Sequence, residues 1–203
     1  MEHFAADVLA FIKTHPDLAA VVIGLTAFAE SFAILSFLFP GFAILVAAGA
    51  LVQAGLINPY AAAGAGATGA ILGDALSYWI GLKFGHVLPK MWPFRRHAEA
   101  LTRGVHFFQE WGWPSVFLGR FFGPVRAFVP LAAGICQMPR GPFYAANILS
   151  AVIWAPALLY SGYLLGTIAH NGWSVEQKAL VAGAIVAALA GAVVLAKKLF
   201  KTR

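Results

Sequence analysis

Two arginines, Arg120 and Arg126, stand in a stretch of sequence that is otherwise uncharged. Residues 111–139 contain no other Lys, Arg, Asp or Glu, and the two arginines lie in the run Gly-Arg-Phe-Phe-Gly-Pro-Val-Arg. An arginine at the centre of a bilayer costs about 2.5–3.5 kcal/mol on insertion scales, so a chain that keeps two needs a reason to keep them. Because guanidinium binds phosphate and carboxylate with paired hydrogen bonds, the two arginines predict an anion site.

The Gly123 and Pro124 pair determines whether the arginines can act together. On a straight helix, positions six apart differ by about 240° and face different sides. Glycine permits a tight reversal and proline removes a backbone donor, so Gly123 and Pro124 predict the tip of a hairpin. With Arg120 on one arm and Arg126 on the other, both guanidinium groups would converge on one anion.

Two acidic residues, Glu30 and Asp74, also lie in apolar surroundings. Glu30 stands ten residues before a break at Pro40 and Gly41, and Asp74 follows a series of small residues that permits close helix packing. Carboxylates in such places can exchange protons, so both are candidates for proton coupling. The alternatives are static pairs between these acids and the arginines that only satisfy the fold, or arginines that extend to the membrane interface.

The composition is that of an integral membrane protein. Hydrophobic residues make up 61% of the 203 positions and charged residues 11%, with a mean hydropathy of +0.79. Soluble domains carry about a quarter charged residues. Residues 31–73 hold no charge at all, and one helix of that length would be about 65 Å long. Since the hydrocarbon core is about 30 Å thick, this segment must fold back or cross twice.

The net charge of +6 arises from basic clusters that flank apolar segments. This distribution favours anionic lipid headgroups as partners and argues against nucleic acid. No cluster of His, Cys and carboxylates has metal-ligand spacing, and no phosphate-binding loop or nucleophile elbow occurs. We therefore expect no metal and no cofactor.

The apolar runs predict an all-α membrane protein. Basic segments are expected in the cytoplasm, and this places two re-entrant helical hairpins at about 30–56 and 112–139, opening from opposite sides. Pro40 and Gly41 would form the tip of the first hairpin. Similar glycine patterns recur in both halves, as in inverted-repeat transporters. The predicted parts are an interfacial helix at 1–16, a membrane domain at 17–170 with a cytoplasmic basic segment at 83–110, and a C-terminal transmembrane helix with a basic tail at 171–203.

Several of these motifs together resemble the DedA family, which shares the VTT domain. They are the Gly-Asp-x3-Tyr-x2-Gly run at 73–81, the two-arginine run at 119–126, and downstream Pro130, Ala133, Gly134, Met138, Phe143, Asn147 and Trp154. The resemblance implies opposed re-entrant hairpins and lipid translocation, with Glu30, Arg120 and Arg126 matching residues that the family needs. One departure is Phe42, which stands where many members carry a second acidic residue.

The resemblance and the charges together lead to a hypothesis of function. We expect a flippase for a phosphate-headgroup lipid in the bacterial inner membrane, with undecaprenyl phosphate as the substrate and a proton or sodium gradient as the driving force. Arg120 and Arg126 would bind the phosphate, Glu30 and Asp74 would couple the ion, and the C-terminus would be cytoplasmic. The alternatives are a phosphatidylethanolamine scramblase, a membrane enzyme of phospholipid metabolism, which lacks a convincing nucleophile, and a scaffold. Self-association is left open.

Overall fold

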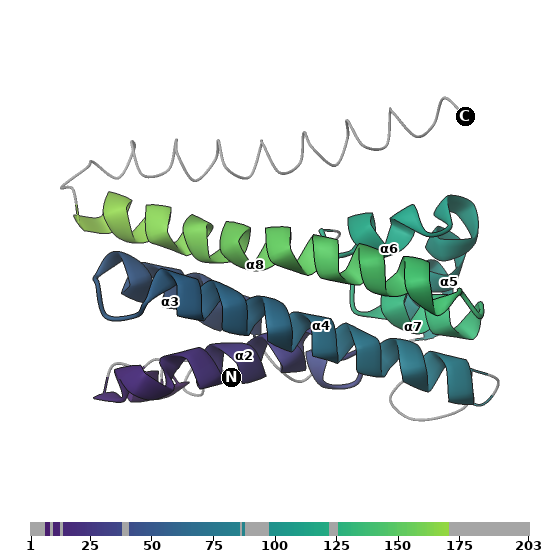
Figure 1. The fold of residues 1–203 in the computed structure, drawn as a ribbon, viewed down its shortest axis with the longest axis horizontal. Helices are drawn as coiled ribbons and strands as arrows, with labels where there is room; N and C mark the ends of the chain where they lie inside the picture. Colours follow the sequence, from purple (N-terminus) through teal and green to yellow (C-terminus); the bar gives the residue numbers. More distant parts are fainter. Residues whose placement is uncertain are drawn as a thin grey trace.

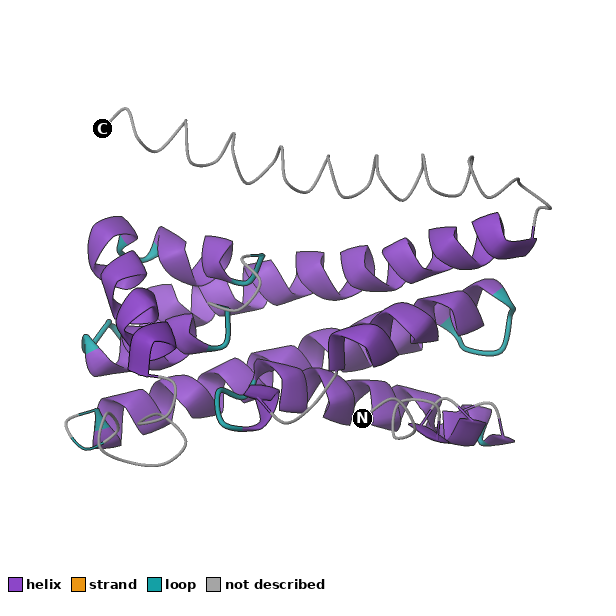
Figure 2. Cartoon of the chain, turned by 180° about the vertical axis from the view of Figure 1, so that it is seen from behind, coloured by secondary structure: helices purple, strands orange, loops and turns teal. Residues whose placement is uncertain are grey.

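The computed structural model describes residues 7–8, 10–12, 14–37, 41–85, 87, 98–121 and 126–170. Within these ranges all regular secondary structure is helical and no strand occurs (Figure 2), which confirms the predicted all-α class. The predicted hairpin-tip residues Pro40, Gly123 and Pro124, most of the basic segment 83–110 and the C-terminal segment 171–203 lie outside the described residues. The elements are η1 (Pro16–Leu18), α2 (Ala19–Ser31), η2 (Leu35–Phe37), α3 (Gly41–Gln53), α4 (Pro59–Phe84), α5 (Ala98–Trp111), α6 (Pro114–Gly119), α7 (Phe128–Ile135) and α8 (Arg140–His170).

Local sequence determines where the central helices begin and end. Asn58 caps α4, since its side-chain oxygen accepts from the backbone N–H groups of Tyr60 at 2.9 Å and Ala61 at 3.1 Å. Pro59 follows at the first helical position, where a missing donor has no consequence. Helix α2 ends where Phe32 adopts an extended backbone (φ −79°, ψ 117°), which turns the chain towards α3.

The two long helices, α4 and α8, form the centre of the molecule. They lie side by side and run antiparallel (Figure 1), with α2 packed on α4 and α3 packed on α8. The shorter helix α7 packs on α4 near the opposite end of the molecule from α3, and α5 and α6 cover α7 and α8 there. The short helices α3 and α7, which follow the two predicted hairpin tips, therefore pack on different long helices.

Glycine contacts set the closest approaches between these helices. Gly49 of α3 meets Gly162 of α8, and Gly134 of α7 meets Gly81 of α4, in each case with no room for a side chain between the backbones. The same applies where Gly69 of α4 faces the backbone of α2. In a membrane the hydrophobic effect does not drive helices together, and small residues allow the close backbone packing that holds them instead.

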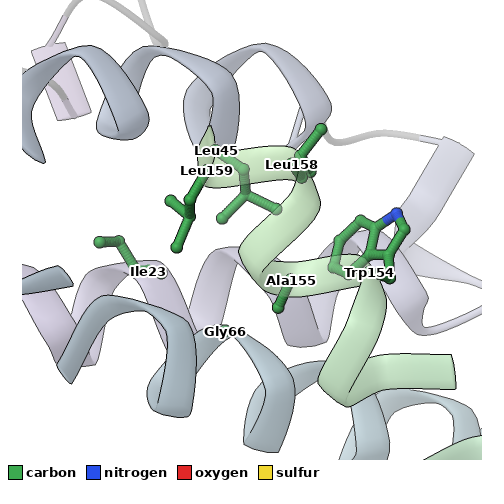
Figure 3. Close-up of a pocket in the computed structure, with 7 residues that line it drawn as sticks. All are labelled: Ile23, Leu45, Gly66, Trp154, Ala155, Leu158 and Leu159. Carbon is green, nitrogen blue, oxygen red and sulfur yellow. The ribbon is translucent and has the colours of Figure 1, made fainter. Parts of the chain in front are cut away.

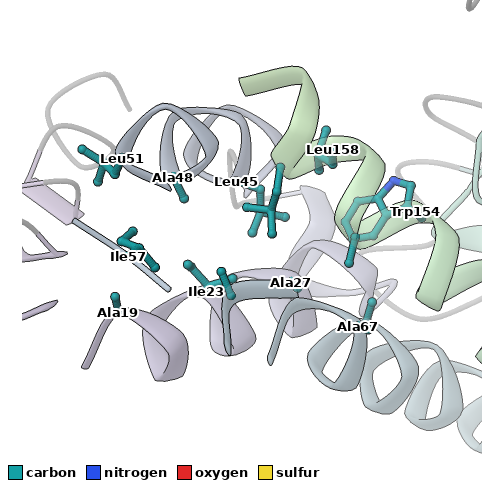
Figure 4. Close-up of a cluster of buried hydrophobic side chains, with 14 of the residues drawn as sticks. Ala19, Ile23, Ala27, Leu45, Ala48, Leu51, Ile57, Ala67, Trp154 and Leu158 are labelled. Carbon is teal, nitrogen blue, oxygen red and sulfur yellow. The ribbon is translucent and has the colours of Figure 1, made fainter. Parts of the chain in front are cut away.

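Buried apolar side chains form two main clusters on either side of a polar layer. The larger cluster joins α2, α3, α4 and α8 (Figure 4) and includes Ala70 and Ala151. The second cluster, around Tyr78 and Phe143, joins α4, α5, α6, α7 and α8. The stretches between the clusters hold the buried polar residues Asp74 and Ser77 on α4 and Asn147 and Ser150 on α8.

One described helix, α8, is long and apolar enough to span a membrane. Its span Arg140–Ile168 has a mean hydropathy of 1.7 in its most apolar stretch, of which 39% is buried inside the protein. A core helix of a soluble protein would be mostly buried, so the exposed apolar face of α8 fits contact with lipid. This helix lies within the predicted membrane domain at 17–170. Helix α4 has 26 residues and is therefore about 39 Å long.

The Gly162 contact makes a testable prediction about stability. In the Gly162→Ala variant the new methyl group would overlap the Val46 carbonyl oxygen, so α3 and α8 must separate. We expect a loss of about 1–3 kcal/mol, typical of overpacking, seen as a lower melting temperature of the purified protein in detergent. The control is Gly64→Ala, where nothing lies within 4 Å of the added group. Equal melting temperatures for the two variants would contradict the close packing.

Candidate functional site

Arg120 lies at the centre of a buried polar network that links three helices. It follows α6 directly, and its Nη2 donates to the carboxylate of Asp74 on α4 and to Asn147 Oδ1 on α8 at 2.6 Å. Its Nε donates to Ser150 Oγ at 2.9 Å. The side chains of Arg120 and Asp74 are only 5% and 9% exposed. The polar layer between the two apolar clusters is therefore an ion pair with its own hydrogen-bond partners.

The partners of Arg120 are held in place by further hydrogen bonds. Asn147 Nδ2 donates to the backbone carbonyl of Ile71 at 3.1 Å, which fixes α8 against α4. Ser150 Oγ donates to the backbone carbonyl of Asn147 at 3.0 Å. A buried ion pair offsets the cost of desolvation only when the geometry is good and the remaining polar atoms are satisfied. The Arg120 network meets this requirement.

Arg126 forms a second ion pair with Glu30, where α2 ends and α3 begins. The Nη2 atom of Arg126 lies 3.1 Å from Glu30 Oε1 and donates a hydrogen bond to the Glu30 backbone carbonyl at 3.2 Å. The side chains are 11% and 14% exposed. Among the described residues, both polar partners of the Arg126 guanidinium belong to Glu30, whereas Arg120 has polar partners on three residues.

The carboxylate of Glu30 also caps the first turn of α3. Its Oε2 accepts from the backbone N–H of Phe42 at 3.2 Å, where the positive end of the helix dipole favours an anion. Gly41 makes this approach possible, because a Cβ at that position would lie 2.5 Å from Glu30 Oε2. The Phe42 side chain is 57% exposed and is an apolar surface group. Gly41 therefore sits beside the charged site rather than acting only as a turn residue.

Trp154 of α8 is shared by the two ion pairs. The guanidinium carbon of Arg126 lies 4.7 Å from the centre of its ring and that of Arg120 lies 5.8 Å away. Cations at this distance from an indole face are stabilised by its negative charge density. The indole also borders an apolar crevice lined by Ile23 and Leu45, which is too narrow for a water molecule (Figure 3). Trp154 thus separates the charged region from the apolar core.

The structure brings all four predicted charged residues together. Arg126 pairs with Glu30 and Arg120 pairs with Asp74. Pairs between these acids and the arginines were one alternative that the sequence left open. Arg120 and Arg126 lie near each other, since their guanidinium carbons lie 5.8 Å and 4.7 Å from the centre of the same Trp154 ring. Among the described residues, no group of three or more His, Cys, Asp or Glu lies close together. Their roles in binding a lipid phosphate or a coupling ion stay predictions.

Three residues on α8 that contact the arginines were not predicted as site residues. Asn147, Ser150 and Trp154 contact the arginines, yet only Asn147 and Trp154 entered the resemblance and none was assigned a task. Their spacing of three and four residues places them on one face of a helix. A polar pair at that spacing inside an apolar span was the available signal.

The Arg120 network predicts an unequal response to the loss of two acidic residues. Asp74→Ala leaves Arg120 buried without its counter-ion, and breaking a buried pair in this way costs about 3–5 kcal/mol. The control is Glu99→Ala. Glu99 and Arg103 form an ion pair of 3.2 Å, but both side chains are exposed, and exposed pairs contribute little to stability. Thermal unfolding in detergent measures both. An equal melting temperature for the two variants would show that the Asp74 pair is not needed for stability.

Comparison with known proteins identifies relatives along most of the chain. The sequence profile of the VTT domain matches residues 39–164. Inner membrane protein YabI of Escherichia coli K12 is 33% identical over 167 residues, covering 82% of this chain and 63% of that protein. Protein DedA of the same strain is 31% identical over 179 residues, covering 82% of this chain and 81% of that protein. An uncharacterized membrane protein of Mycobacterium tuberculosis H37Rv is 31% identical over 195 residues, covering 90% and 88% of the two chains.

The extent of these matches limits what they say about the whole protein. The chain spans 61% and 63% of the lengths of two of the relatives, a Buchnera aphidicola membrane protein and YabI. No solved structure is significantly similar to the chain. The matching residues 39–164 nevertheless cover more than half of the chain and include Asp74, Arg120, Arg126 and Trp154. The chain therefore belongs to the DedA family of membrane proteins, whose common unit is the VTT domain.

Proposed function

We propose that this protein moves a lipid with a phosphate headgroup across the bacterial inner membrane, with undecaprenyl phosphate as the substrate. The observation that carries the proposal is the Arg126–Glu30 pair, which joins the end of α2 to the segment before α7. A cation and a carboxylate are held together there between helices that are otherwise apolar. No bond in the lipid needs to be broken, so the proposal includes no enzyme activity.

The chemistry of Arg126 suits an anionic headgroup. Guanidinium binds phosphate through paired hydrogen bonds, and here it sits near the first turn of α3, where the helix dipole also favours an anion. Both guanidinium groups lie over the Trp154 ring, so positive charge is concentrated in one region. The lipid tails would stay in the hydrocarbon while the headgroup passes this region.

The helix contacts support an inverted repeat with two opposed re-entrant hairpins. The Gly49–Gly162 contact between α3 and α8 corresponds to the Gly134–Gly81 contact between α7 and α4. Helices α3 and α7 have 13 and 8 residues, so they are about 20 and 12 Å long, and neither crosses a core about 30 Å thick. In this proposal the basic segment 83–110 and the C-terminus face the cytoplasm and its anionic lipids.

Glu30 is the proposed coupling residue. A carboxylate that loses its charge on protonation no longer competes for Arg126, so proton uptake would free the guanidinium for a phosphate. A sodium ion would act in the same way by neutralising the carboxylate. Asp74 is a second candidate, although its place in the Arg120 network gives it less freedom.

A second candidate substrate is phosphatidylethanolamine. Its headgroup carries a phosphate and an amine, and Glu30 and Arg126 offer one charge of each sign about 3.1 Å apart. A zwitterionic headgroup could engage both partners without a net change in the charge of the site. A liposome transport assay with each of the two lipids distinguishes these candidate substrates.

Transport by the purified protein in liposomes tests the proposal. We expect movement of labelled polyprenyl phosphate across the bilayer, and we expect it to fall by at least about tenfold in Arg126→Ala, since a charge-assisted hydrogen bond contributes roughly 1.5–3 kcal/mol. Glu30→Gln should abolish the response to an imposed pH gradient because it cannot take up a proton. The control is Arg103→Ala, in an exposed pair. Wild-type protein that moves no labelled lipid, or full activity in Arg126→Ala, would contradict the proposal.

A further inference from the structure

We propose that the two arginines have different tasks. Arg126 is the residue that contacts the lipid phosphate, whereas Arg120 is a positioning residue that holds the α8 face carrying Trp154. This inference rests on the proposed function and assigns the contacts within the same site. It differs from the expectation that both guanidinium groups grip one anion.

The hydrogen bonds that Arg120 makes to described residues all belong to the buried network. Its Nε and Nη2 serve Ser150, Asn147 and Asp74 on two helices. A phosphate that displaced Asp74 from this guanidinium would leave the carboxylate, only 9% exposed, buried without its counter-ion. Such an uncompensated buried charge is strongly unfavourable. The contacts of Arg120 therefore fit a permanent structural pair.

Arg126 has contacts that a single event can release. Its two acceptors among the described residues are Oε1 and the backbone carbonyl of Glu30. The carboxylate has a second attachment, because Oε2 accepts from the backbone N–H of Phe42. Glu30 can therefore give up Arg126 and still keep a hydrogen bond at the start of α3. Both members of this pair are also more exposed than those of the Arg120 pair.

Arg120 acts on the site through one face of α8. Asn147, Ser150 and Trp154 share this face, and Arg120 binds the first two while lying 5.8 Å from the ring of the third. The same ring lies 4.7 Å from Arg126. The Arg120 network therefore fixes the indole, and the indole is the surface against which Arg126 is placed.

Conservative variants separate the two tasks, because lysine keeps the charge but cannot serve several acceptors in a fixed plane. Each variant is purified, its melting temperature is measured in detergent, and its transport of labelled polyprenyl phosphate is measured in liposomes as a function of lipid concentration. Arg126→Lys should raise the apparent KM roughly tenfold with little change in melting temperature. Arg120→Lys should lower the melting temperature and the maximal transport rate but keep the apparent KM within about twofold of the wild type, since Trp154 shifts while Arg126 keeps its contacts with Glu30.

The paired neutral variants supply a second test. Asp74→Asn with Arg120→Gln removes one ion pair and keeps polar groups for Asn147 and Ser150, and Glu30→Gln with Arg126→Gln removes the other. We expect the first double variant to keep the apparent KM within about twofold at a lower maximal rate and the second to lose transport while remaining folded.

The inference is overturned if Arg120→Lys raises the apparent KM as much as Arg126→Lys does, or if Arg120→Lys leaves the melting temperature unchanged. If neither Arg120 variant folds, Ser150→Ala removes a single partner and is judged by the same criterion: an unchanged KM retains the inference and a raised KM overturns it. Failure of the proposed function is distinguishable from these outcomes, because the wild-type protein itself would then move no polyprenyl phosphate.

Discussion

The need to neutralise two arginines away from water governs the rest of this structure. Asp74 lies about 22 Å from the start of α4 and about 15 Å from its end, well inside the helix. A guanidinium at that depth is stable only beside a carboxylate and with its other donors satisfied. The polar layer of Asp74, Asn147 and Ser150 meets this demand between two apolar clusters. The helices must therefore meet in one register.

Close backbone packing is what brings the charges into that register. Gly69 and Gly73 let α4 approach α2, and Gly81 with Gly134 lets α7 approach α4. These contacts place the end of α2, which carries Glu30, and the start of the α7 segment, which carries Arg126, against each other. A larger residue at any of these glycines would move a whole helix, since the obstructing atoms belong to backbone. Packing and electrostatics here are thus one constraint.

The sequence was sufficient to predict the helical class and to identify the four charged residues, because a charge within an apolar segment can be recognised from the sequence alone. The opposed hairpins predicted Glu30 as the counter-ion of both arginines, whereas in the structure Glu30 pairs with Arg126 and Asp74 pairs with Arg120. The choice of Asp74 for Arg120, and the support from Ser150, depend on how α8 is rotated against α4, which no local pattern determines. The role of Gly41 could not be predicted for a similar reason. Its lack of a Cβ makes room for the Glu30 side chain, which is eleven residues away in the sequence.

The asymmetry between the two pairs follows from where each carboxylate is anchored. Asp74 projects from the middle of α4, where the backbone N–H groups are already used within the helix, so its charge depends on Arg120 and the groups beside it. Glu30 lies at the end of α2 and reaches an N–H group in the first turn of α3, which has no acceptor of its own within that helix. The Glu30 carboxylate consequently has a partner whether or not Arg126 is bound to it. The anion exchange that we propose for this site needs such a residue, and in the described part of the chain Glu30, hydrogen-bonded at the start of α3, meets this need.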